Sequence, residues 1–202
     1  MLELIRNTII DFCAEFIKNP YLCYTEHGQH ALFYSMLLDR MTEEEKYIDL
    51  KGQKICTVQK EYPTATDLDR SKRQHWDIAI LQNPPQTSQR EDNQSFDFLN
   101  LLAVIEFGLN ENREHLEDDI DRLCHEGANV EHRFIIHLYR LSEGGNKFSN
   151  RDWSPESQQI VPISEIQNFI IKKPIEVFYA VSNTSGKTPS GFWILSGGVN
   201  DH

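Results

Sequence analysis

Two apolar runs on either side of a helical segment constrain the fold of this chain most. Residues 101–107 read LLAVIEF, and residues 132–141 contain FII at their centre. A strand buried on both faces is apolar at almost every position, as these runs are. The segment 112–126 between them has apolar residues at helical spacing: Leu116, Ile120, Leu123 and Cys124. Its outer face, expected to be solvated, is acidic: Glu117, Asp118, Asp119 and Asp121. The pattern predicts a strand–helix–strand crossover in a mixed sheet.

The rest of the chain has shorter periodic segments of both kinds. Helical spacing covers residues 2–17 and 25–40, and Thr25 is placed to cap the second helix. Short helices are expected to begin near Ser154 and Ser164. Four more strands are predicted, with the last two pairing, at residues 55–63, 75–81, 175–181 and 192–195. The order indicates an α/β protein with one domain over residues 1–202.

Composition excludes several classes of protein. Lys and Arg number 20 against 31 Asp and Glu, a formal charge of −11, whereas sequence-independent nucleic-acid binders usually carry a basic surface. The chain lacks an apolar stretch of about 18 residues, so no membrane span is expected. Its first residues lack the basic segment of a signal peptide, and the four cysteines are widely scattered. A cytoplasmic location with reduced thiols is the prediction.

Three acidic residues interrupt segments that otherwise have the pattern of buried elements. Asp77 lies near the start of the strand at 75–81, Glu106 lies near the end of the run LLAVIEF, and Glu26 begins the second helix. A buried carboxylate needs a cation, a metal ion or a proton. Several carboxylates at one point would bind a hard cation such as Mg²⁺, which prefers oxygen ligands. Such a site suits metal-assisted hydrolysis of phosphodiesters.

These acids, on these elements, resemble the motif of the restriction-endonuclease-like, or PD-(D/E)XK, nucleases. That family has an acid on the leading helix, an Asp at the start of the second strand and a Glu-X-Lys on the third. Here Glu26, Asp77 in HWDIAIL and Glu106 in VIEFG match those positions. The resemblance covers residues 25–141 and implies an α-β-β-β-α-β core, a mixed sheet flanked by helices. The N-terminal helix and the C-terminal helices and strands would pack on that core.

The same resemblance implies the chemistry and the partners. It implies a nuclease that hydrolyses nucleic acid with Mg²⁺ or Mn²⁺. Glu26, Asp77 and Glu106 would hold the metal, and the backbone carbonyl of Phe107 would complete its shell. Nucleic acid is the expected partner, a second copy of the chain or a larger complex is possible, and no membrane is expected.

One position departs from the family pattern. Gly108 stands where the motif has its lysine, the residue that orients water and stabilises developing charge. Lys60, expected on a neighbouring strand, is the first candidate to replace it, with Lys54 or Arg113 behind it. Otherwise the metal acts alone, or the chain is a catalytically inactive module that binds a protein or nucleic-acid partner. Whether the chain is an enzyme therefore stays open at this point.

Each acid also has a structural interpretation. Asp77 could bond to a loop beside its strand. Glu106 could form a buried ion pair with Arg73 or His75. Glu26 could be a first-turn acid stabilised by the helix dipole. These alternatives require no metal.

Other polar residues near the expected site point to two further hypotheses. Arg70, Lys72 and Arg73 could form a basic strip that contacts nucleic acid. His27 and His30, in EHGQH, could share a helix face as zinc ligands. The HExxH motif is absent, however, and the sequence shows no third ligand. A zinc hydrolase is therefore the less favoured interpretation.

Overall fold

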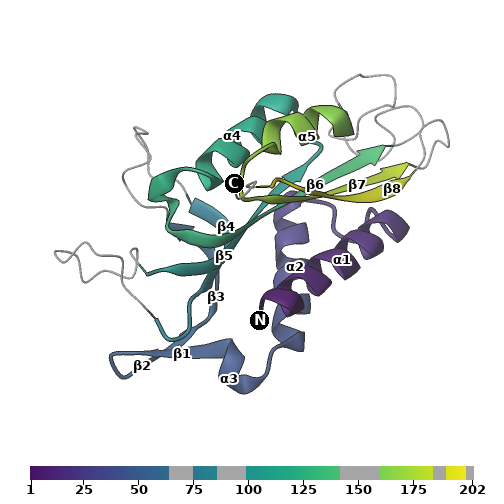
Figure 1. The fold of residues 1–202 in the computed structure, drawn as a ribbon. Coiled ribbons are helices and arrows are strands. Elements are labelled where there is room, and N and C mark those ends of the chain that lie inside the picture. Colours follow the sequence, from purple (N-terminus) through teal and green to yellow (C-terminus); the bar gives the residue numbers. More distant parts are fainter. Residues whose placement is uncertain (64–74, 86–98, 142–159, 184–189, 199–202) are drawn as a thin grey trace.

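Six strands form one mixed sheet with helices on both faces (Figure 1). A computed structural model describes residues 1–63, 75–85, 99–141, 160–183 and 190–198. The strands lie side by side in chain order: β3 (Val58–Pro63), β4 (His75–Leu81), β5 (Leu101–Leu109), β6 (Val130–Leu141), β7 (Glu176–Asn183) and β8 (Gly191–Ser196). Strands β5, β6 and β7 are parallel, and the other neighbours are antiparallel. The predicted mixed α/β sheet flanked by helices is confirmed.

Two pairs of helices cover the two faces of this sheet. Helices α1 (Leu2–Lys18) and α2 (Glu26–Arg40) cover one face, and α4 (Arg113–Leu123) and α5 (Ile163–Ile170) cover the other (Figure 1). Each pair packs its own apolar layer against the strands. Among the described helices, none has both the length and the apolar character needed to cross a bilayer.

The strand–helix–strand crossover is present as predicted. Strands β5 and β6 pair in parallel over residues 101–109, and α4 lies between them in the chain. The side chain of Asn112 caps α4 by accepting a hydrogen bond from the His115 amide at 3.0 Å. The predicted helix end at residue 126 is wrong, because α4 ends at Leu123. A 3₁₀ turn, Glu126–Ala128, follows and leads through the left-handed Asn129 into β6.

The predicted strand from residue 55 to residue 63 is wrong in its start, whereas its end is confirmed at Pro63. The segment is divided at Thr57 between β2 (Gln53–Cys56) and β3. Strand β2 pairs with β1 (Tyr47–Leu50), which follows the short helix α3 (Glu43–Lys46), in a hairpin beside the main sheet (Figure 1). The hairpin turns at Lys51 and Gly52, whose φ angles of 54° and 77° suit a tight two-residue turn.

The C-terminal predictions are largely confirmed. Strands β7 and β8 pair antiparallel, and α5 begins at Ile163, next to the predicted Ser164. The predicted helix near Ser154 lies outside the described residues.

Candidate metal and catalytic site

The candidate site lies where β4 and β5 separate. Their backbone pairing ends at Ile78 of β4. Asp77, the residue before it, bonds to β5 through its side chain instead. Its Oδ2 accepts a hydrogen bond from the Phe107 amide at 2.8 Å. Two residues further along β5, the Leu109 amide donates to Oε2 of Glu26 at 3.0 Å. Alternate amides of a strand point to the same edge, so two carboxylates occupy this edge of β5.

A buried arginine fixes the chain that leads into Glu26. The guanidinium of Arg140, on β6, donates at 3.0–3.3 Å to the carbonyl oxygens just before α2: Pro20, Cys23 and Tyr24. Thr25 then caps the helix, as predicted, by accepting from the Gly28 amide at 3.1 Å. The start of α2 is thereby tied to the central sheet, which holds Glu26 against the edge of β5.

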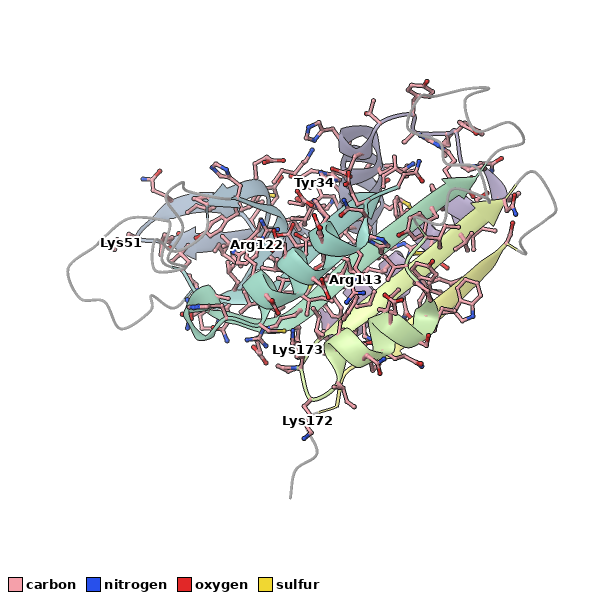
Figure 2. All side chains as sticks on the ribbon, turned by 90° about the horizontal axis from the view of Figure 1, so that it is seen from above. Tyr34, Lys51, Arg113, Arg122, Lys172 and Lys173 are labelled. Carbon is pink, nitrogen blue, oxygen red and sulfur yellow. The ribbon has the colours of Figure 1, made fainter. Side chains whose placement is uncertain are left out.

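Glu106 lies beside Asp77 and packs against α4. It is 2% exposed, and its Oε2 is 2.9 Å from Nη2 of Arg122. Arg122, labelled on α4 in Figure 2, also donates to Asp119 at 2.8 Å. The predicted buried ion pair therefore exists, but its partner is Arg122 rather than His75. The other expected partner, Arg73, lies outside the described residues.

Asp77 interacts electrostatically with each of the other two acids. Burial, followed by the Asp77 charge, raises the pKa of Glu106 well above its ordinary value, although Arg122 opposes the shift. Burial also raises the pKa values of Asp77 and Glu26, and the charge of Asp77 contributes to the shift of Glu26. The Asp77 charge raises the pKa of Glu106, so one proton shared between the two carboxyl groups favours the pair. The structure thus places Asp77 near both Glu106 and Glu26.

The donor set fits a hard divalent cation. Oε1 of Glu106 is buried with no hydrogen-bond partner among the described residues. Asp77 and Glu26 each use one oxygen for a β5 amide, which leaves the other oxygen for a cation. The N–H and C=O of one strand residue point to the same edge, so the carbonyl of Phe107 lies on the same edge as Asp77. These oxygens are the ligands that Mg²⁺ and Mn²⁺ prefer.

Sequence reasoning missed Arg122 and His115, the two residues of α4 that pair with Asp119. Asp119 was expected on the solvated face, but it is 4% exposed and bonds to Arg122. Nδ1 of His115 lies 3.1 Å from the other Asp119 oxygen, and this hydrogen bond is the main cause that raises the pKa of His115 to about 9. The sequence did contain a signal for these pairs, because His115 precedes Asp119 by four residues and Arg122 follows it by three, the spacings at which helix side chains meet.

At Gly108, where the nuclease motif has a lysine, His137 fills the space that a side chain would need. A Cβ atom added to Gly108 would lie 2.8 Å from Nδ1 of His137. The His137 ring is buried, lies 3.1 Å from the Tyr139 hydroxyl through Nε2, and stacks on Tyr179 with ring centroids 6.1 Å apart. Burial lowers the pKa of His137 to about 3, so the ring is neutral at pH 7. Glycine is therefore required here for close packing.

Substituting Gly108 with Ala should lower the free energy of unfolding by about 1–3 kcal/mol, because the fixed imidazole leaves no room for a methyl group. Urea unfolding measures the loss. A His137→Ala background should reduce the cost of the substitution in a double-mutant cycle. Gly198→Ala is the control, since an added Cβ meets nothing within 4 Å there. An equal cost of Gly108→Ala in both backgrounds would contradict the assigned contact.

Of the three candidates to replace the lysine, Lys60 is the one that the structure connects to Asp77, through His30. Its charge, after burial, contributes to lowering the pKa of His30 to about 4, and Nε2 of His30 lies 3.8 Å from Asp77 Oδ2. Lys54 lies over a tyrosine ring in the β1–β2 hairpin. Arg113 pairs with Glu165 at 3.2 Å at the other end of α4 (Figure 2). The proposed strip of Arg70, Lys72 and Arg73 lies outside the described residues.

The two histidines of EHGQH have a third potential ligand in the structure. Ligand atoms of His27, His30 and Glu61 all lie within 4.8 Å of one another. Glu61 comes from β3, opposite the start of β4, where its φ angle is 52°. The sequence did not reveal it because helical spacing within α2 says nothing about a neighbouring strand.

Comparisons of the chain with protein-family models, with curated proteins and with solved structures found no significant match. The chemistry of the site has to be inferred from its residues and their geometry.

Proposed function

We propose that this chain is a metal-dependent nuclease that hydrolyses phosphodiester bonds of nucleic acid. The carrying observation is that Asp77 and Glu26 share one edge of β5, that Asp77 lies beside Glu106, and that all three acids have raised pKa values. A restriction-endonuclease-like core from α2 to β6 is part of the proposal. The adjacent order β3-β4-β5-β6, with β6 parallel to β5, supports it.

The carboxylates and the Phe107 carbonyl would hold Mg²⁺ or Mn²⁺. The cation supplies charge stabilisation at the phosphate and a water of lowered pKa. Burial and mutual repulsion disfavour ionised acids here, so a divalent charge relieves both penalties. Lys60, exposed on β3, is the proposed replacement for the motif lysine. Its ammonium would stabilise the negative charge that develops on the phosphate.

Metal binding tests this proposal without a choice of substrate. Calorimetric titration of Mn²⁺ and Mg²⁺ should show binding to the wild type and its loss in Asp77→Asn/Glu106→Gln. The exposed Asp39, on the outer side of α2, provides the matched control, and Asp39→Asn should bind as the wild type does. Undiminished Mn²⁺ and Mg²⁺ binding by the double variant would overturn the assignment of these acids.

The Arg122–Glu106 ion pair favours a second candidate function. A guanidinium 2.9 Å from Glu106 already neutralises this carboxylate, and Gly108 has no space for a lysine. A chain of this kind could be a catalytically inactive module that binds a protein or nucleic-acid partner. Wild-type protein that binds no divalent cation, alone or with an oligonucleotide, would favour this module over the nuclease.

A further inference from the structure

Two histidines and a glutamate lie together on the α2 side of the sheet, next to the acids described above. His27 and His30 are three residues apart on α2, so they lie on one side of the helix. Glu61 reaches the same point from β3, and potential ligand atoms of the three residues lie within 4.8 Å of one another. The group combines two imidazole nitrogens with one carboxylate, unlike the oxygen-only set of Glu106, Asp77 and Glu26.

His30 is the residue whose surroundings require an explanation. Its side chain is 1% exposed, and neither ring nitrogen has a hydrogen-bond partner within the part of the chain that the structure describes. The Asp77 carboxylate, 3.8 Å from Nε2, is too distant for a hydrogen bond. The ring packs on Phe107 with centroids 4.6 Å apart, which limits its rotation. A buried polar group without a partner is rare, and a missing ligand is one reason for it.

The other two groups can adjust around His30. His27 and Glu61 are exposed, so their side chains can rotate without disturbing the core. Ligand atoms around a tetrahedral zinc ion lie about 3.3 Å apart, given bonds of about 2.0–2.1 Å. The observed separations, up to 4.8 Å, therefore require only a modest closure of two surface side chains.

We propose that His27, His30 and Glu61 bind a divalent transition-metal ion such as Zn²⁺. Two histidines and one carboxylate leave further coordination positions for water or for a substrate oxygen. Imidazole ligands select zinc-like ions over Mg²⁺, which prefers oxygen. The positive charge of Lys60, which acts on His30, would repel a bound cation. The carboxylate of Glu61 would attract the cation. This site shares no ligand with the three acids, so it can be tested independently of the nuclease proposal.

Co²⁺ is the probe, because its visible absorption reports nitrogen ligands and low coordination number. Full-length protein stripped of metal with a chelator should develop these bands when Co²⁺ is added and lose them when Zn²⁺ is added. His27→Ala and Glu61→Gln should each weaken binding by more than about 100-fold, since loss of a direct ligand exceeds the cost of losing its supporting contacts. Both residues are exposed, so these variants should fold.

Two controls separate this site from its neighbours. His132→Ala removes another histidine beside a glutamate, Glu131 at 3.4 Å, and should leave Co²⁺ binding unchanged. Glu106→Gln should retain the Co²⁺ spectrum, while Asp77→Asn/Glu106→Gln loses Mn²⁺ and Mg²⁺. Absence of the Co²⁺ bands from the wild type, or unchanged bands and wild-type affinity in both His27→Ala and Glu61→Gln, would overturn the zinc-type site and leave the nuclease proposal untouched.

Discussion

The Asp77→Asn variant is expected to lose metal-dependent cleavage of nucleic acid by at least about 1,000-fold, a loss of about 4 kcal/mol of transition-state stabilisation. The substitution removes a charge that would hold the cation but retains an oxygen at the same place. That oxygen can still accept the hydrogen bond that the Phe107 amide donates at 2.8 Å. The fold should therefore persist, and activity should fall far more than stability.

Single-turnover cleavage of single- and double-stranded DNA and RNA, in Mg²⁺ and in Mn²⁺, measures this loss. Thermal unfolding of the same samples checks the fold. Asp39→Asn removes an exposed acid from α2 and should cleave at the wild-type rate. Retained cleavage by Asp77→Asn would mean that the metal is assigned to the wrong carboxylate.

The Arg122→Met variant should have the largest effect on stability. At pH 8 the free energy of unfolding should fall by about 3–5 kcal/mol, because removal of one partner leaves a buried charge without compensation. Glu106 is 2% exposed, and Arg122 is its ion-pair partner at 2.9 Å. Asp119, 4% exposed, loses the same cation. Urea unfolding at fixed ionic strength gives the value.

The loss should be smaller at pH 5 than at pH 8. Burial and the Asp77 charge raise the pKa of Glu106 in the folded protein. Between the ordinary value and this raised value the unfolded chain ionises first, so rising pH lowers the free energy of unfolding through that window. Without Arg122 the folded pKa rises further, and the window extends to higher pH. Protonation at pH 5 removes much of the uncompensated charge.

A second arginine on the same helix provides the control for Arg122. Arg113 forms exposed pairs with Glu117 and Glu165, so Arg113→Met should cost no more than about 1 kcal/mol. Adding Glu106→Gln to Arg122→Met should recover part of the stability by removing the unpaired charge. An equal, pH-independent loss in the Arg113 and Arg122 variants would contradict the buried ion pair.

The central elements were predictable because burial determines their composition. Strand β4 occupies the predicted residues 75–81, and the apolar runs became the parallel strands β5 and β6. The β1–β2 hairpin was not predicted, because most of its residues are exposed or only partly buried and need no apolar pattern. The end of α4 was misplaced because Gly127 lies inside a separate 3₁₀ turn, Glu126–Ala128, rather than at the end of the helix.

The candidate site was predictable only in part for the same physical reason. Glu106 and Asp77 were identifiable because a carboxylate is costly in an apolar strand. Their partners come from elsewhere in the fold, so spacing along the chain did not show that Arg122 would reach Glu106. Gly108 was interpreted as a missing lysine, whereas the structure shows that His137 excludes any side chain there. The sequence alone contains no signal for that tertiary contact.

The carboxylates on β5 also affect which molecules can join the sheet. An unpaired strand edge offers free amides on which another chain can add a strand and begin to aggregate. At Phe107 and Leu109 those amides already donate to Asp77 and Glu26. An incoming strand would find no free donor at either position and would meet acidic groups instead. Asp77 and Glu26 thus occupy two β5 amides that an added strand would need.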